Sequence, residues 1–124
     1  MKSILSVLLL LVGITMYSCA QSPKSQIAQV LTAQDFKAKL AATPNAILLD
    51  VRRPDEIAGG KIEGSINIVY GEPNFEAELA KLDATKPIFI YCAGGVRSAK
   101  SCPNLEKLGF KAIYDLKGGY GSWQ

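Results

Sequence analysis

One stretch in the second half of the chain restricts the possible folds more than any other. Residues 87–98 read Pro-Ile-Phe-Ile-Tyr-Cys-Ala-Gly-Gly-Val-Arg-Ser, so a short apolar run ends at Cys92 and two adjacent glycines follow. A run of this length is typical of a buried strand, and paired glycines allow a tight loop whose backbone N–H groups point into one concavity. The stretch therefore predicts a strand that delivers a cysteine into a loop at the start of a helix.

The surroundings predicted for Cys92 favour its thiolate. Backbone N–H groups, the start of a helix and the nearby Arg97 all stabilise negative charge. The chain contains no histidine, so the commonest general base and the commonest zinc ligand are both absent. We therefore take Cys92 as the candidate nucleophile and expect no metal and no cofactor; the alternative interpretation of Cys92 is a small buried apolar residue.

Length and charge narrow the possible functions. With 124 residues, of which 48% are hydrophobic, the chain has room for one globular domain and little more. The net charge of +3 is small and no run of Lys or Arg occurs, so nothing indicates a nucleic-acid partner. We expect a monomer.

The first 19 residues have the pattern of a secretory signal. Lys2 is followed by an apolar segment over residues 4–14 and by small residues around Cys19. The apolar segment is shorter than a membrane-spanning helix requires. The order Met-Tyr-Ser-Cys over residues 16–19 resembles the lipobox of bacterial lipoproteins, which implies that Cys19 is lipidated and becomes the mature N-terminus. An ordinary cleaved signal and a retained N-terminal anchor remain alternatives.

A flexible tether is predicted after the signal. Residues 20–29 are rich in Ser and Gln and contain Pro23, a composition typical of linkers, and the folded domain is predicted over residues 30–124. We therefore expect the protein outside the cytoplasm, in the periplasm or cell envelope, and attached to a membrane through its N-terminal lipid.

The rest of the chain alternates between predicted helices and strands. We expect helices over residues 33–42, 54–58 and 74–82, and strands over residues 46–51, 88–91 and 111–116. Residues 62–70 are expected to hold a turn and a short strand. Ser98 is predicted to cap a further helix that ends at Gly109. Pro103 should kink this helix or divide it into two segments, because proline lacks an N–H and clashes with the carbonyl of Ala99. The alternation predicts an α/β fold with a parallel sheet covered on both faces, in which ligands bind beyond the carboxyl ends of the strands.

Several separate blocks of the sequence occur in an order shared with a known family. The blocks are Leu48–Arg52, Pro54–Ile57, Gly60–Ile68, Ile90–Gly95, Arg97–Ser98, Leu108–Phe110, Leu116–Tyr120 and Trp123. Together they resemble a single-domain rhodanese over nearly all of the chain beyond the N-terminal segment. The resemblance implies a rhodanese-like three-layer α/β/α fold with a parallel sheet of about five strands. It also implies a sulfurtransferase, in which Cys92 takes sulfane sulfur from thiosulfate or a persulfide donor, holds it as a persulfide, and passes it to cyanide or a thiol acceptor.

By the same resemblance the active loop runs over six residues, from Cys92 to Arg97. The residues expected to bind the sulfur-containing anion are Ala93, Gly94, Gly95, Val96, Arg97 and Ser98. Phosphatase and arsenate-reductase relatives of the fold use C-x5-R, which is one residue longer, and Ser98 stands where their arginine would be. Loop length therefore disfavours phosphate chemistry, while a non-catalytic binding or sulfur-carrier module remains an alternative.

Two departures from the family pattern bear on the substrate. Most rhodaneses have His at the position of Lys61, and many that use thiosulfate have a cationic or polar residue where Ala93 and Gly94 stand. Fewer cationic contacts should weaken the binding of a dianion such as thiosulfate, so the donor is open between thiosulfate and a persulfide or polysulfide.

Other residues receive structural interpretations. Asp50 and Arg52 are expected to form a pair that supports the site, and Gly118-Gly119 to form a simple turn. Cys102 has three interpretations: a small buried residue on a helix, a disulfide partner that would abolish the nucleophile, or a thiol that resolves an intermediate on Cys92.

Overall fold

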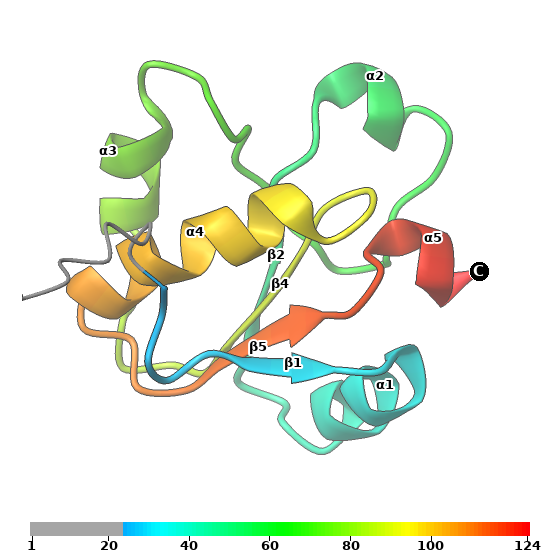
Figure 1. The fold of residues 1–124 in the computed structure, drawn as a ribbon, viewed down its shortest axis with the longest axis horizontal. Coiled ribbons are helices and arrows are strands. Elements are labelled where there is room, and N and C mark those ends of the chain that lie inside the picture. The colour runs from blue at the N-terminus through cyan, green and yellow to red at the C-terminus, as the bar shows by residue number, and fades with distance from the viewer. Residues whose placement is uncertain (1–23) are drawn as a thin grey trace, which may run out of the picture.

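The computed structural model describes residues 24–124, in which five parallel strands form a sheet between two layers of helices (Figure 1). In chain order the elements are β1 (Gln29–Leu31), α1 (Ala33–Ala41), β2 (Ile47–Asp50), α2 (Pro54–Ile57), β3 (Ile66–Asn67), α3 (Phe75–Ala80), β4 (Ile88–Tyr91), α4 (Val96–Lys107), β5 (Ile113–Leu116) and α5 (Tyr120–Trp123). The strand order β1-β5-β4-β2-β3 places β4 in the centre of the sheet. The predicted α/β fold with about five parallel strands is confirmed.

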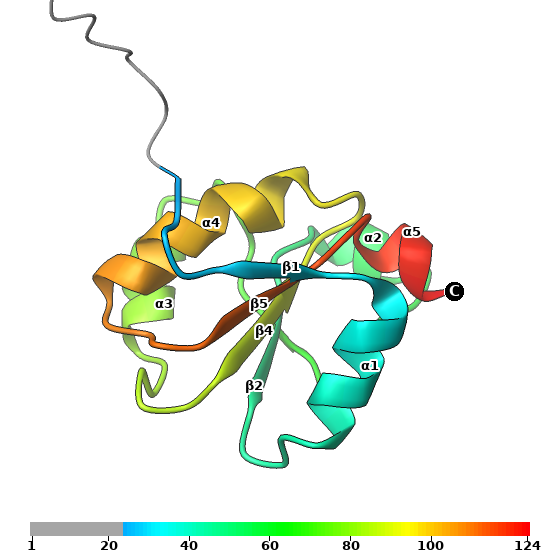
Figure 2. The same cartoon turned by 60° about the horizontal axis from the view of Figure 1, so that its bottom comes forward.

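The central strand β4 supplies side chains to both hydrophobic layers. Ile88 and Ile90 belong to the layer beneath α3 and α4, whereas Phe89 and Tyr91 belong to the layer that contains Phe36 of α1. Successive side chains of a strand point to opposite faces, and all four are fully buried, which explains why the sequence of β4 is apolar throughout instead of alternating. Figure 2 shows α4 and α1 on opposite sides of the sheet.

The helix α1 is fixed by its N-cap and by one aromatic side chain. The Thr32 hydroxyl accepts a hydrogen bond from the backbone N–H of Asp35 at 3.2 Å, as expected for a threonine at this position. Phe36 packs edge-to-face on Phe89, with ring centroids 5.2 Å apart, and on Trp123 at 6.1 Å. The last turn of the chain is thereby held against the first helix.

The strand β1 was not predicted from the sequence. Gln29 and Val30 are exposed, so this short edge strand has neither an apolar run nor an alternating pattern. It is held by its parallel pairing with β5 over three residues. The expected tether over residues 20–29 also ends differently, because Ile27 and Ala28 pack against the core.

The helix that follows the Cys92 loop differs from the prediction in two respects. It begins at Val96 with Gly95 as its N-cap, not at a cap formed by Ser98, and it continues through Pro103 as one helix. Of the two outcomes expected at Pro103, a kink or a division into two segments, the division is therefore wrong. Ala99, whose carbonyl loses a partner because Pro103 has no N–H, is exposed, so this carbonyl can accept hydrogen bonds from water.

The predictions for the N-terminus concern residues that the structure does not describe. The signal peptide over residues 1–19, the lipidated Cys19 and the first part of the tether all lie outside residues 24–124. Within residues 24–124, no helix has the length and apolar character needed to cross a membrane.

Candidate active site

Cys92 lies where the central strand ends. It directly follows Tyr91, the last residue of β4, and only three residues separate it from the first turn of α4. Its side chain is 1% exposed and belongs to the hydrophobic layer under α4. The structure therefore places Cys92 beyond the carboxyl end of a parallel strand, where ligands bind in folds of this class.

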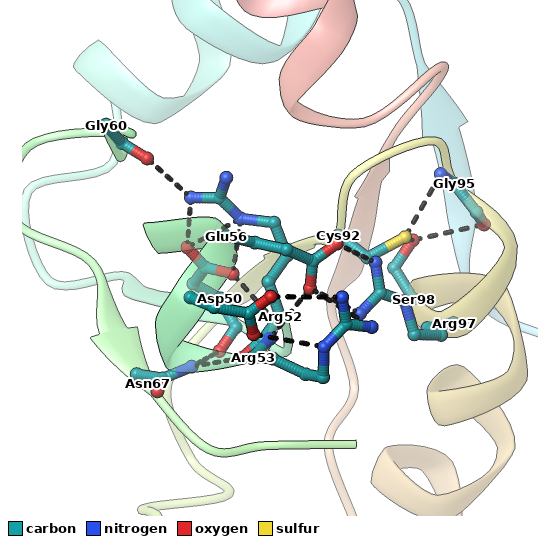
Figure 3. A network of polar contacts seen from close by, with 11 residues as sticks. Asp50, Arg52, Arg53, Glu56, Gly60, Asn67, Cys92, Gly95, Arg97 and Ser98 are labelled. Carbon is teal, nitrogen blue, oxygen red and sulfur yellow. Dashed lines mark hydrogen bonds and ion pairs between the residues drawn. The ribbon is translucent and has the colours of Figure 1, made fainter. Parts of the chain in front are cut away.

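The loop directs hydrogen-bond donors at the Cys92 sulfur. The backbone N–H of Gly95 donates to Sγ at 3.0 Å (Figure 3). The Cys92 thiol lies 3.5 Å from the Ser98 hydroxyl oxygen, to which it donates, and the Ser98 hydroxyl donates to the Gly95 carbonyl at 3.2 Å. Gly95 has a φ of +104°, a conformation that glycine adopts without strain, and this conformation turns the chain from the loop into α4. The sulfur thus sits at the N-terminus of a helix of 12 residues, where the helix dipole favours negative charge.

The net effect of these surroundings is a lowered pKa of the Cys92 thiol. Burial alone would raise the pKa of Cys92, because it penalises the thiolate. Hydrogen bonds from the Ser98 hydroxyl and from backbone N–H groups of Ser98, Gly95 and Gly94 outweigh burial and hold the pKa below its ordinary value. Since the thiolate is the nucleophilic form, these surroundings favour the form of Cys92 that a nucleophile requires.

Backbone hydrogen bonds from the C-terminal turn support the Cys92 loop. The backbone N–H of Tyr120 donates to the carbonyl of Cys92 at 2.7 Å, and that of Gly121 donates to the carbonyl of Ala93 at 3.2 Å. A Cβ atom on Gly119 would lie 2.5 Å from backbone atoms of both Cys92 and Ala93. The sequence analysis interpreted Gly118-Gly119 as a simple turn. In the structure, the absence of a side chain at Gly119 lets this turn contact the backbone of the Cys92 loop, a role that the sequence analysis missed.

Arg97 is engaged by a partner that the sequence did not predict. Its guanidinium makes a bidentate ion pair with Glu56 of α2, with Nη1–Oε2 and Nη2–Oε1 distances of 2.8 and 2.7 Å. The backbone N–H of Arg53 also donates to Glu56, at 2.9 Å, and these contacts, led by Arg97, lower the pKa of Glu56 to about 2. Figure 3 shows Glu56 between the two arginines. Arg97 thus joins the start of α4 to α2, and its charge is compensated.

Asp50 and Arg52 form a buried ion pair, as the sequence suggested. The guanidinium of Arg52 donates to the Asp50 carboxylate at 2.7 to 3.1 Å and to the carbonyl of Gly60 at 2.9 Å. Both side chains are at most 3% exposed. The guanidinium also lies 4.3 Å from the ring centre of Tyr120, so the pair reaches the turn that supports the Cys92 loop.

One further polar residue completes this network. The side-chain amide of Asn67 donates to the carbonyls of Asp50 and Arg52 at 2.8 and 2.9 Å. These hydrogen bonds fix the backbone of Asp50 and Arg52 at the end of β2. The two residues are therefore held by the ion pair between their side chains and by the contacts of Asn67 with their main chain. Asn67 lies within one of the family-like sequence blocks, which was the available signal for it.

Cys102 is a buried thiol one helical turn beyond Ser98. Its Sγ donates to the Ser98 carbonyl at 3.3 Å, and the side chain is 1% exposed. Burial raises its pKa to about 12, which removes the thiolate at neutral pH. Cys92 and Cys102 are both free thiols in the structure, an arrangement that matches the first of the three interpretations of Cys102.

The described part of the chain offers no set of metal ligands. Residues 24–124 contain no cluster of three or more His, Cys, Asp or Glu side chains able to hold an ion.

Comparisons with known proteins agree with this geometry. The sequence profile of the family described as "Rhodanese-like domain" matches residues 32–124. A putative sulfurtransferase from Bacillus subtilis, YtwF, is 31% identical over 99 residues, which cover 80% of this chain and 92% of that protein. A tRNA uridine(34) hydroxylase from Pelagibacter ubique is 43% identical over 82 residues, but the match covers 65% of this chain and only 27% of that protein.

A solved structure extends the likeness to the fold. The crystal structure of a rhodanese-related protein from Thermoplasma volcanium superposes with a TM-score of 0.64 at 34% identity, covering 77% of this chain and 89% of that one. The family match includes every element from α1 to α5 and the whole Cys92 loop. Residues 32–124 form a rhodanese-like domain, and the chain belongs to the rhodanese-like family.

Proposed function

We propose that this protein is a sulfurtransferase in which Cys92 carries sulfane sulfur as a persulfide. One observation carries the proposal: the Cys92 sulfur accepts the Gly95 N–H at 3.0 Å at the N-terminus of α4. That position stabilises a thiolate without help from a neighbouring base, and sulfur transfer needs a thiolate and no proton donor.

The reaction follows from two displacement steps. In the first, the Cys92 thiolate attacks the outer sulfur of a donor such as thiosulfate; a bond forms between the two sulfurs, the donor S–S bond breaks, and sulfite leaves with its electron pair. In the second, cyanide or a thiolate acceptor attacks the outer persulfide sulfur, and the Cys92 thiolate departs. Backbone N–H groups of the loop stabilise the negative charge on sulfur throughout both steps.

The charges around the loop favour a donor of low charge. Arg97 is paired with Glu56 and Arg52 with Asp50, and the side chains of Ala93, Gly94 and Val96 are uncharged. A thiosulfate dianion therefore meets backbone N–H groups but no uncompensated arginine from these pairs. We propose a persulfide or polysulfide as the preferred donor, with thiosulfate to cyanide transfer as a slower assayable reaction.

The location of the enzyme belongs to the same proposal. The N-terminal pattern supports export, lipidation of Cys19 and attachment to the outer face of a membrane, which would place the thiol in the periplasm or cell envelope. Expression of the full chain in a bacterial host tests this: the membrane fraction should hold a lipid-modified form, and Cys19→Ala should release the protein from that fraction. An unmodified wild-type chain in the cytoplasm would contradict the assignment.

Thiocyanate release tests the catalytic assignment. Wild-type protein given thiosulfate and cyanide should produce thiocyanate, and Cys92→Ser should not. Cys102→Ser is the matched control, because it removes a buried thiol that takes no part in the proposed reaction and should leave most of the activity. Activity that survives Cys92→Ser would overturn the proposal.

A sulfur-carrier or binding module is the second candidate function. It is favoured by the charges around the loop, where Arg97 is paired with Glu56 and Arg52 with Asp50, so that little uncompensated positive charge attracts a small anion such as cyanide. A carrier would accept sulfur on Cys92 and release it to a protein partner but not to cyanide. Persulfide formation without thiocyanate release would select this candidate.

A further inference from the structure

Tyr120, the first residue of α5, contacts both the Cys92 loop and the buried ion pair. Its backbone N–H donates to the Cys92 carbonyl at 2.7 Å. The centre of its ring lies 4.3 Å from the guanidinium carbon of Arg52. The proposed reaction gives this side chain no role, although Tyr120 belongs to the turn that holds the loop.

Three residues from separate segments fix the Tyr120 ring. They are Arg52 after β2, Gly60 after α2 and Tyr91 of β4, whose ring centre lies 6.3 Å from that of Tyr120. A Cβ atom on Gly60 would lie 2.5 Å from the Tyr120 hydroxyl oxygen, so a side chain there would displace the ring. Arg52 also donates to the Gly60 carbonyl at 2.9 Å (Figure 3). The residues around the ring are therefore held to one another as well.

Burial strengthens the contact between Arg52 and Tyr120. A guanidinium over an aromatic ring is attracted by the negative charge of the ring face, and this attraction is larger where water is excluded. The Arg52 side chain is 3% exposed and is paired with the Asp50 carboxylate at 2.7 Å. The Tyr120 ring therefore lies on a group that is buried and fixed in position by its own partner.

The Cys92 loop has few side chains that could hold its shape. The three residues that precede α4 have no polar side chain; they are Ala93, Gly94 and Gly95. The carbonyls of Cys92 and Ala93 are held instead by backbone N–H groups of the C-terminal turn. The distance of 3.0 Å between the Gly95 nitrogen and the Cys92 sulfur therefore depends on where this turn lies.

We propose that Tyr120 is a positioning residue: its ring, held on Arg52, keeps the C-terminal turn against the Cys92 carbonyl, so that the N–H groups of the loop stay directed at the sulfur. Tyr120 acts through the backbone of the loop and not on the sulfur itself. Without the ring, the turn loses its hold on Arg52, the loop relaxes, and the thiolate loses part of the hydrogen bonding that favours it. The inference rests on the proposed function, since it takes Cys92 as the reacting thiol.

The pH dependence of Cys92 alkylation by iodoacetamide tests the inference. The full chain is used between pH 6 and pH 10, and peptide mass spectrometry separates Cys92 from the other cysteines. Tyr120→Leu should move the midpoint of the profile upward by about half a unit or more, which slows alkylation about threefold at any pH below the midpoint. At the highest pH, where the thiolate is fully formed, the two proteins should react at similar rates. An unchanged or lowered midpoint in Tyr120→Leu would overturn the inference.

Two further variants separate the role of the ring from a general effect of lost packing. Tyr120→Phe keeps the ring on Arg52 and removes only the hydroxyl, so it should restore the wild-type midpoint; a shift as large as that in Tyr120→Leu would refute the role of the ring. Tyr114→Leu is the matched control. The Tyr114 ring also lies near a cation, with Lys39 Nζ 4.8 Å from its centre, but it packs on Phe89 within the sheet. Its loss should leave the midpoint unchanged, and an equal shift in Tyr114→Leu would contradict the inference.

The second cysteine separates a displaced loop from an unfolded chain. Cys102 is 1% exposed, so its alkylation marks protein that has opened. If Tyr120→Leu does not fold, Arg52→Lys keeps a charge for Asp50 but removes the planar group on which the ring lies. This variant should move the midpoint in the same direction, and an unmoved midpoint would refute the inference. Alkylation needs no sulfur donor, so a protein that alkylates as expected but transfers no sulfur would refute the proposed function and not the positioning role.

Discussion

Replacing Gly119 by alanine should damage the active loop far more than an alanine at a comparable glycine elsewhere. Gly119 has φ +63° and ψ −158°, a region that residues other than glycine occupy only at a cost of about 1–3 kcal/mol. The added Cβ would also lie 2.5 Å from the Ala93 carbonyl group and from the Cys92 carbonyl oxygen. Overpacking of this kind costs about 1–3 kcal/mol in well-packed sites. The two effects together predict a loss of roughly 3 kcal/mol or more in the free energy of unfolding.

Gly109 provides the matched control. It has a φ of +96°, but a Cβ there would meet no atom within 4 Å. Gly109→Ala should therefore cost only about 1–2 kcal/mol from backbone strain. Urea denaturation gives both values, and the rate of Cys92 alkylation reports the state of the loop, which should change in Gly119→Ala alone. Equal losses in the two variants, with unchanged alkylation, would refute the claim that Gly119 is required by the close approach of the turn to the loop.

Three further predictions concern the ion pairs around the site. Arg52→Ala leaves the buried Asp50 carboxylate unpaired and should cost about 3–5 kcal/mol in urea denaturation; a loss below 1 kcal/mol would contradict the buried pairing. Glu56→Gln frees the charge of Arg97 beside the loop, so the KM for the thiosulfate dianion should fall several-fold, while the KM for an alkyl persulfide, which carries at most one negative charge, should fall less. An unchanged or higher thiosulfate KM would refute the role of donor charge. Folding lowers the pKa of Glu56 from 4.5 to about 2, so its stabilisation is present above pH 4.5 and is lost as pH falls towards 2. Acid titration of the unfolding free energy should therefore be steeper in wild type than in Glu56→Gln, and parallel curves would contradict the shift.

The sequence predicted the parts of the fold whose pattern is local. The apolar run before Cys92 identified β4, and the paired glycines after it identified the loop, because both features lie within a few residues of each other. The helix α1 was visible from Thr32 and the spacing of Phe36. Such features depend on neighbours in the chain, and sequence patterns describe neighbours well.

The features that were missed depend on contacts between distant segments. Glu56 and Arg97 are 41 residues apart, so nothing in either local sequence indicates that they pair. The strand β1 is exposed at Gln29 and Val30 and exists through its pairing with β5. Asp115 resembles an ordinary polar residue in a strand, and only the helix packed over it makes the carboxylate buried.

Pro103 shows the opposite case, in which a sound local rule is overridden. Proline in a helix interior removes one hydrogen bond, yet α4 continues through Pro103. One face of this helix is buried, and its residues are Ser98, Ser101, Cys102 and Leu105. Packing of this face holds the helix together across the missing bond. The tertiary contacts of this face outweigh the cost that the local rule assigns to a proline inside a helix.

The mass of the intact protein after incubation with a sulfur donor tests the central claim most directly. Wild-type protein treated with a persulfide or with thiosulfate should gain the mass of one sulfur atom on the peptide that contains Cys92 and lose it again on addition of cyanide. The fraction of protein that carries this sulfur should be larger with the persulfide than with thiosulfate. Cys92→Ser should gain nothing, whereas Cys102→Ser should behave as wild type. A wild-type protein that gains no sulfur from either donor, or that gains it on another cysteine, would contradict the account.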